Sequence, residues 1–142
     1  MSAVWGIHPL RPTVDFADGD TIALERPGVG DLRRFGEDRK AIKQTLAAAY
    51  PNESDGTISQ WAGTLLRFAF TAEEGDLLVH PNPRRRTLSI GRLAGDYFWR
   101  DDLPVDEHCR RVRWVQRGVS RDRFSAEAQS AAGGRAAFFS IK

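Results

Sequence analysis

The sequence contains a single cysteine, Cys109, which excludes a disulfide bond within the chain. One thiol also provides no cysteine cluster for structural zinc. No uncharged apolar run approaches the roughly 20 residues that a membrane-spanning helix needs, and the first residues do not resemble a signal peptide. These absences favour a cytoplasmic protein with neither a disulfide framework nor a membrane partner.

Motifs for catalysis are absent as well. The sequence has no carboxylate cluster of the kind that two-metal nucleases need, no His-Glu-x-x-His zinc motif, no phosphate-binding loop and no Gly-x-Ser-x-Gly nucleophile elbow. His8, His80, His108 and Cys109 could meet at a metal only through the fold, and ordinary structural roles are the favoured interpretation. The sequence therefore predicts a chain that is not an enzyme and needs no metal or cofactor.

Large apolar side chains are plentiful by contrast. The 142 residues include eight Phe and four Trp, and 41% of the sequence is hydrophobic. This is enough apolar volume for one core, and the length is that of one ordinary domain. We therefore expect residues 1–142 to form a single domain.

Charge is distributed unevenly, although the net charge is only +2. Residues 1–83 carry eight Lys or Arg and twelve Asp or Glu, whereas residues 84–123 carry eleven Arg and six acidic residues. Arginine binds phosphate through two parallel hydrogen bonds and stacks on bases, so nucleic acid is a candidate partner. Solvated surface charge is the competing interpretation. The phosphate-binding candidates are Arg84, Arg85 and Arg86 at an expected hairpin turn, with Arg33 and Arg34 as further positions.

The order of expected elements predicts an α+β fold. Apolar residues recur at helical spacing over 38–50 and 57–70, and a short polar helix is expected over 125–131. Alternating or continuous apolar segments predict strands at 4–10, 21–24, 77–80, 87–93, 97–100, 110–115 and 136–141, with a loop at 101–107. Because the two main helices fall between the second and third strands, a mainly antiparallel barrel is favoured over a βαβ sheet.

Several aromatic residues are candidates for stacking on a base that has been flipped out of a duplex. Core packing is the competing interpretation, and it is favoured for Trp114. Ser59 and Gln60 place hydrogen-bonding groups beside Trp61, a combination that could read a base edge. The base-binding candidates are Trp5, Ser59, Gln60, Trp61, Tyr97 and Trp99.

Three segments, Ile58–Phe68, Gly75–Val79 and Leu88–Leu93, are similar to the helix, Gly-Asp turn and Ile-Gly strand of EVE-like domains in the PUA superfamily. The chain resembles still more closely the N-terminal specificity domain of Mrr-type, modification-dependent restriction endonucleases. The further segments with counterparts there are Trp5–His8, Gly95–Trp99 and His108–Trp114. The similarity extends over roughly residues 4 to 141, and it depends on the order of the motifs.

The resemblance implies a PUA/EVE-like β-barrel of about six or seven strands, mixed but mainly antiparallel, with two or three helices inserted between strands two and three. Related domains hold a modified base in an aromatic cage between the first strand and the helix before the Gly-Asp turn. Carried over to this sequence, the cage positions are Trp5, Gln60 and Trp61, with Ser59 beside them. In the restriction enzymes a nuclease domain follows, so the chain is either the N-terminal part of a longer restriction protein or a stand-alone reader with a nuclease partner.

The leading hypothesis is therefore a DNA-binding specificity module of a restriction or defence system, which recognises a modified base by flipping it into an aromatic pocket. One alternative is a winged-helix DNA-binding domain that does not flip bases, with 38–50 and 57–70 as its helices and Arg84–Arg86 at the tip of its wing. A PUA-like RNA-binding domain is the other.

Overall fold

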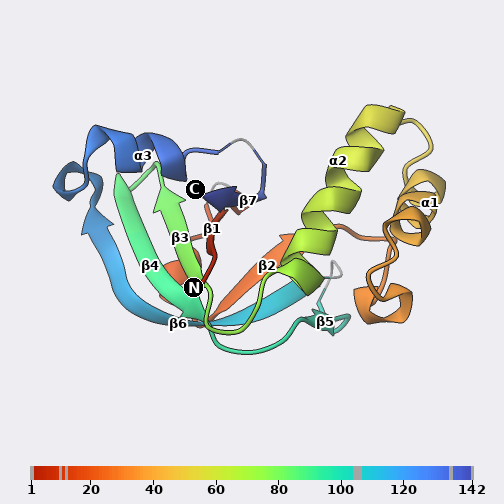
Figure 1. Ribbon diagram of the computed structural model, residues 1–142, viewed down its shortest axis with the longest axis horizontal. Helices are drawn as coiled ribbons and strands as arrows, with labels where there is room; N and C mark the ends of the chain where they lie inside the picture. The colour runs from red at the N-terminus through yellow and green to blue at the C-terminus, as the bar shows by residue number, and fades with distance from the viewer. Residues whose placement is uncertain (1, 10, 12, 104–106, 135, 142) are drawn as a thin grey trace.

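The structure is a computed structural model that describes residues 2–9, 11, 13–103, 107–134 and 136–141. It is an α+β fold in which one curled sheet is flanked by two longer helices at one end and by a short helix at the other (Figure 1). The α+β class and the mainly antiparallel sheet are as the sequence predicts.

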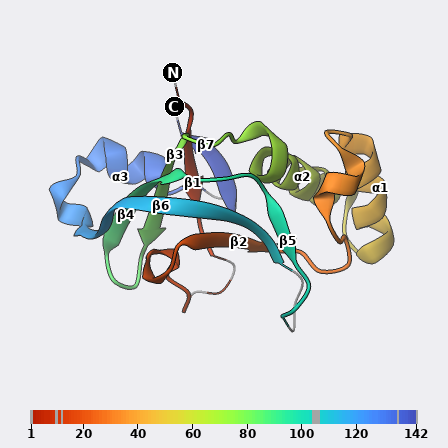
Figure 2. The same ribbon diagram turned by 90° about the horizontal axis from the view of Figure 1, so that it is seen from below.

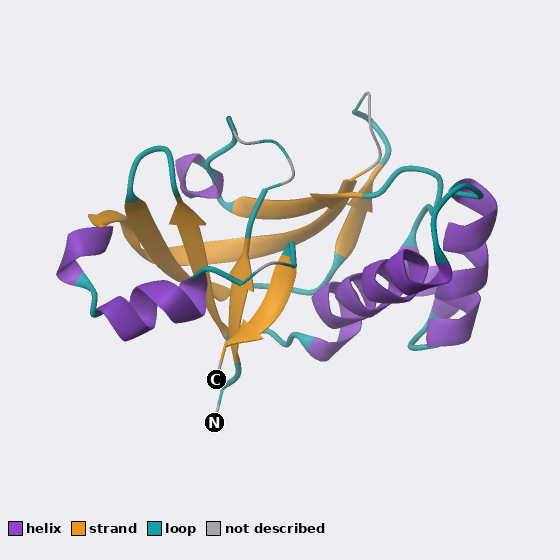
Figure 3. Cartoon of the chain, turned by 90° about the horizontal axis from the view of Figure 1, so that it is seen from above, coloured by secondary structure: helices purple, strands orange, loops and turns teal. Residues whose placement is uncertain are grey.

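Seven strands form the sheet in the order β2-β6-β4-β3-β1-β7, with β5 also paired to β6. Within the described strands only β1 and β3 run parallel. The sheet curls into a half-barrel, as Figures 2 and 3 show from opposite sides. The strands are β1 (Val4–Ile7), β2 (Thr21–Glu25), β3 (Leu77–Asn82), β4 (Thr87–Leu93), β5 (Phe98–Arg100), β6 (Glu107–Ser120) and β7 (Phe138–Ile141).

Strand β6 makes most of the curl. It is 14 residues long, and its first half pairs with β2 and β5 while its second half pairs with β4. The β4–β6 register shifts around Ile90, which is the kind of irregularity that bends a strand. A Cβ at Gly91 would lie 2.8 Å from the Val112 side chain, so the close approach at this bend requires glycine. The strand begins at Glu107, so the prediction of a loop there is wrong at this residue. Residues 104–106 of the expected loop lie outside the described residues.

The two predicted main helices are confirmed as α1 (Arg39–Ala49) and α2 (Asp55–Leu66), both between β2 and β3. Each begins at a side-chain cap: Asp38 accepts a hydrogen bond from the Ala41 backbone N–H, and Ser54 accepts one from that of Thr57. A π-helical turn over Arg67–Thr71 extends α2 toward β3. The remaining helices are α3 (Ala126–Ala132), between β6 and β7, and the short 3-10 segments η1 (Phe16–Asp18), η2 (Leu32–Phe35) and η4 (Arg121–Arg123).

A buried arginine ties β6 to the end of α2. Arg110 is 2% exposed, and its guanidinium donates to the backbone carbonyls of Phe68 at 2.9 Å, Ala72 at 2.8 Å and Gly95 at 2.9 and 3.1 Å. The first two carbonyls belong to the C-terminal end of the helix, where a positive charge is favourable. Burial lowers the pKa of Arg110, while the charges of nearby acidic residues oppose that shift.

His80, which is 1% exposed, is neutral in this packing. Its Nδ1–H donates to the Ile7 carbonyl, and its Nε2 accepts from the Phe16 backbone N–H at 3.1 Å, which requires an unprotonated Nε2. Burial lowers the pKa of His80 below the usual 6.5, and the charge of His8 adds to that shift. The Ile7 carbonyl and the Asp15 carboxylate, which lies 3.2 Å from Nε2, oppose it. Arg85 also forms an ion pair with Asp15, so the negative charge of this carboxylate is shared between Arg85 and His80.

A histidine whose pKa is depressed by folding destabilises the protein as it becomes protonated. The free energy of unfolding should therefore be highest above pH 6.5 and should fall as the pH is lowered from there through the folded-state pKa of His80. Urea unfolding between pH 7.5 and about pH 5 measures this. The variant His80→Gln should flatten the slope. The pKa of Asp15 is held below 3.8, so its own titration lies outside this window.

Candidate nucleic-acid interface

The expected aromatic cage is not formed, first because Trp5 lies in the core. Trp5 is 4% exposed and stacks on Phe138, with ring centroids 5.0 Å apart, while its indole N–H donates to the buried Asp76 carboxylate at 2.9 Å. No face of this ring is open to a base. Strand β1 lies between β3 and β7, which turns its alternate side chains into the half-barrel.

Trp61 on α2 is half-buried and already has partners on its ring. The Arg26 guanidinium lies 3.8 Å from the ring centroid, and Tyr50 meets Trp61 edge-on at 5.2 Å. The recess beside Trp61 has a volume of about 10 Å³, no more than a single water molecule requires. A base cannot enter there, so the predicted cage of Trp5 and Trp61 is wrong for this conformation.

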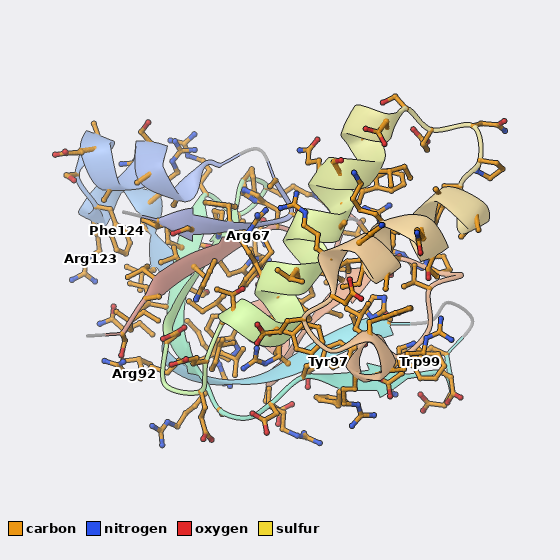
Figure 4. The ribbon with its side chains drawn as sticks, turned by 45° about the vertical axis from the view of Figure 1, so that its right-hand side comes forward. Arg67, Arg92, Tyr97, Trp99, Arg123 and Phe124 are labelled. Carbon is orange, nitrogen blue, oxygen red and sulfur yellow. The ribbon has the colours of Figure 1, made fainter. Side chains whose placement is uncertain are left out.

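Tyr97 is also a structural residue. It is 5% exposed, and its hydroxyl accepts from the Leu32 backbone N–H at 3.0 Å and pairs with His108 Nδ1 at 2.7 Å. Burial raises the pKa of Tyr97. Trp99 on β5 is half-buried, and its indole N–H has no hydrogen-bond partner among the described residues. Figure 4 places both side chains near β5, below the two long helices.

A pocket of about 750 Å³ lies between α1 and α2, within the size range of small-molecule sites. We call it the α1–α2 pocket. Ser59, one of the expected base contacts, lines it, whereas the neighbouring Gln60 is exposed and is not among its described lining residues. The lining residues are Arg39, Lys40, Lys43, Gln44, Ala47, Tyr50, Pro51, Glu53, Asp55, Ile58 and Ser59.

Tyr50 is the one aromatic residue among these described lining residues. It caps α1, and its hydroxyl donates to the Pro27 carbonyl at 2.6 Å, which fixes the ring. The edge-on contact with Trp61 supports it from α2. A ring held at both ends suits stacking, because little side-chain entropy remains to be lost when a ligand binds.

The walls of the α1–α2 pocket carry more positive charge than they neutralise. Lys43 lies 3.9 Å from Asp55, an exposed and weak ion pair. Arg39 and Lys40 form no ion pair among the described residues. Positive groups without acidic partners beside a pocket can attract a phosphate-bearing ligand.

Most of the predicted phosphate-binding arginines have acidic partners within the chain. Arg85 pairs with Asp15 at 2.9 Å and with Asp18 at 3.2 Å, and Arg33 pairs with Asp31 at 2.6 Å. Arg86 lies 3.8 Å from Asp122, and Arg34 donates to the Val29 carbonyl. Of the five, Arg84 is exposed and forms no ion pair or hydrogen bond among the described residues.

The basic hairpin, with Arg84–Arg86 at its tip, lies far from α1 and α2. Its tip joins β3 to β4 beside η4, where the Arg121 backbone N–H donates to the Arg86 carbonyl. Figures 1 and 2 both place this tip at the α3 end of the sheet, with α1 and α2 at the opposite end. A wing that acts with its recognition helix would have to lie beside it, so the arrangement does not support the winged-helix alternative.

The sequence patterns do not predict the α1–α2 pocket. Of its lining residues, only Ser59 is among the candidates that the sequence indicates, and Tyr50 and Arg39 are not. The signal that could have found the pocket is the short Pro51–Ser54 connection, because a loop of this length makes neighbouring helices antiparallel and brings the start of α1 to the end of α2.

Comparisons with known proteins give one match. A sequence model described as "Domain of unknown function (DUF8426)" matches residues 12–132. No curated protein and no solved structure matches the chain. Across the described part of the chain, no helix has the length and apolar character to cross a bilayer. In the same residues, no group of three or more His, Cys, Asp or Glu side chains is placed to hold a metal ion.

Proposed function

We propose that this chain, which belongs to the DUF8426 family, is a nucleic-acid-binding module that receives a flipped, modified base of DNA in the α1–α2 pocket. It acts without catalysis of its own, as the reading component of a restriction or defence system whose nuclease is a separate domain or subunit. The observation that carries this proposal is the pocket itself, which has a volume of about 750 Å³ and is bordered by a fixed aromatic ring. Two of its lining cations, Arg39 and Lys40, form no ion pair among the described residues.

The overall architecture supports a PUA/EVE-like assignment. The curled, mainly antiparallel sheet with α1 and α2 between β2 and β3 is the arrangement that the resemblance implies. The base position differs from the cage that the resemblance suggested, because Trp5 is in the core and Trp61 is covered by Arg26. In this proposal Tyr50 supplies the stacking surface, and Ser59 lies on the opposite helix within reach of a base edge.

Phosphate contacts from this end of the molecule make duplex binding dependent on salt. Two or three contacts give a slope of about −2 to −3 in a plot of log K against log salt, so raising NaCl from about 50 to 200 mM should weaken binding by about 10- to 60-fold. Fluorescence anisotropy with a labelled duplex carrying one modified cytosine or adenine measures this slope.

The variant Lys40→Gln should reduce the slope by about one, because Lys40 has no acidic partner in the described chain. Arg123→Gln, at the opposite end of the molecule, is the matched control and should leave the slope unchanged (Figure 4). Affinity that is insensitive to salt would argue against the proposal. Stronger competition by RNA of the same sequence than by DNA would favour the RNA-binding alternative.

A further inference from the structure

Two guanidinium groups lie side by side over Gly63, in the middle of α2. An ideal Cβ at Gly63 would be 3.2 Å from Arg67 Nη1 and 3.3 Å from Arg39 Nη2. Arg67 comes from the turn after α2, and Arg39 begins α1, so two separate elements deliver like charges to one point. Figure 4 shows Arg67 against the side of α2.

The contacts of these two groups within the chain are weak and neutral. Arg39 Nη2 donates to the Ser59 carbonyl at 3.2 Å, and Arg67 Nη2 donates to Thr64 Oγ1 at 3.4 Å. Neither arginine forms an ion pair with any residue that the structure describes. Burial, and then the charge of Arg39, lower the pKa of Arg67. Two adjacent positive charges without a counter-charge repel each other, and an anion placed between them would relieve that repulsion.

We propose that Arg39 and Arg67 form a phosphate-binding site over Gly63. This inference rests on the proposed function and specifies it: the ligand is a backbone phosphate of the nucleotide whose base occupies the α1–α2 pocket. Arg39 belongs to both sites, because it also lines the pocket. Each guanidinium can donate to a non-bridging phosphate oxygen, and such charge-assisted bonds are among the stronger hydrogen bonds in proteins.

Gly63 is part of the site because it leaves room for the guanidinium pair. Its residue position is buried, and the atoms nearest to an added Cβ are the flexible ends of Arg39 and Arg67. Alanine is the better helix former, so Gly63→Ala should not weaken α2. The added methyl must nevertheless displace the two guanidinium groups by a few tenths of an ångström. This substitution therefore separates anion binding from stability.

The test uses the intact chain with two probes, inorganic phosphate and a short duplex with one modified base. Phosphate should shift the amide resonance of Gly63 and raise Tm relative to chloride at equal ionic strength. Arg39→Gln and Arg67→Gln should each abolish both responses, weaken duplex binding about tenfold, and lower its salt slope by about one. Gly63→Ala should melt at or above the wild-type Tm and still bind phosphate and duplex less tightly.

Arg113→Gln is the matched control, because Arg113 is exposed on β6 and forms no ion pair among the described residues. Wild-type binding of both probes by Arg39→Gln and Arg67→Gln would overturn the phosphate site. If those variants keep wild-type duplex affinity while the duplex still binds with a steep salt slope, the site is wrong and the proposed function stands. If phosphate shifts Gly63 but no duplex binds, the proposed function fails and the site serves a free anion.

Discussion

Arg110→Met is expected to lower the free energy of unfolding by about 3 kcal/mol or more, because three buried backbone carbonyls lose their hydrogen-bond donor. Methionine fills much of the same volume but donates no hydrogen bond. The carbonyls of Phe68, Ala72 and Gly95 would then lose the donor that satisfies them in a buried region. The connection between β6 and the end of α2 would be lost at the same time.

Urea unfolding at pH 7.5 measures the change, and Tm should fall by roughly 10 °C. Arg110→Lys should recover only part of the loss, because one ammonium group cannot reach three carbonyls as the planar guanidinium does. Arg113→Ala, three residues along the same strand and exposed, should change stability by no more than about 0.5 kcal/mol. A wild-type denaturation midpoint for Arg110→Met would show that the buried guanidinium is not needed.

Arg110 also illustrates what the sequence could and could not predict. The alternation Arg110, Arg111, Arg113 shows that one arginine faces away from the other two, but two-residue periodicity does not say which face is the interior. Arg110 faces the interior because β6 passes beneath the end of α2, where the carbonyls of Phe68 and Ala72 accept hydrogen bonds from its guanidinium. That placement depends on a contact between residues about forty positions apart, which local patterns do not contain.

The helices were predictable for the opposite reason. The apolar stripes of 38–50 and 57–70, and the caps Asp38 and Ser54, are local features, and α1 and α2 follow them closely. The start of β6 was not predictable, because the acidic segment before it is typical of a loop, and Glu107 joins the strand only through pairing with Glu25 and Arg100.

The sequence indicates aromatic and arginine residues as candidates for a nucleic-acid site, but it does not show which of them already have partners within the fold. The Trp5 indole N–H donates a hydrogen bond to Asp76, and Arg85 forms an ion pair with Asp15. Such pairings join residues about seventy positions apart and are set by the tertiary fold. The groups on α1 and α2 that lack such partners can therefore be identified only from the three-dimensional structure.

Tyr50→Ala is expected to remove discrimination between modified and unmodified duplexes and to weaken binding of the preferred duplex by about 5- to 150-fold. This range corresponds to the roughly 1–3 kcal/mol that stacking of one base on an aromatic ring contributes. The reason is that Tyr50 is the aromatic member of the described pocket lining. A panel of duplexes that differ in one base modification, compared by anisotropy at fixed salt, measures both quantities.

Tyr50→Phe is the matched control, because it keeps the ring and loses the hydroxyl that donates to the Pro27 carbonyl. It should retain discrimination and most of the affinity. Trp61→Ala removes the edge contact with Tyr50 without removing a residue that lines the pocket, so its effect should be smaller than that of Tyr50→Ala. If Trp61→Ala abolishes discrimination and Tyr50→Ala leaves it intact, the base stacks on Trp61 and not on Tyr50. Arg26 would then have to move off the Trp61 ring when DNA binds.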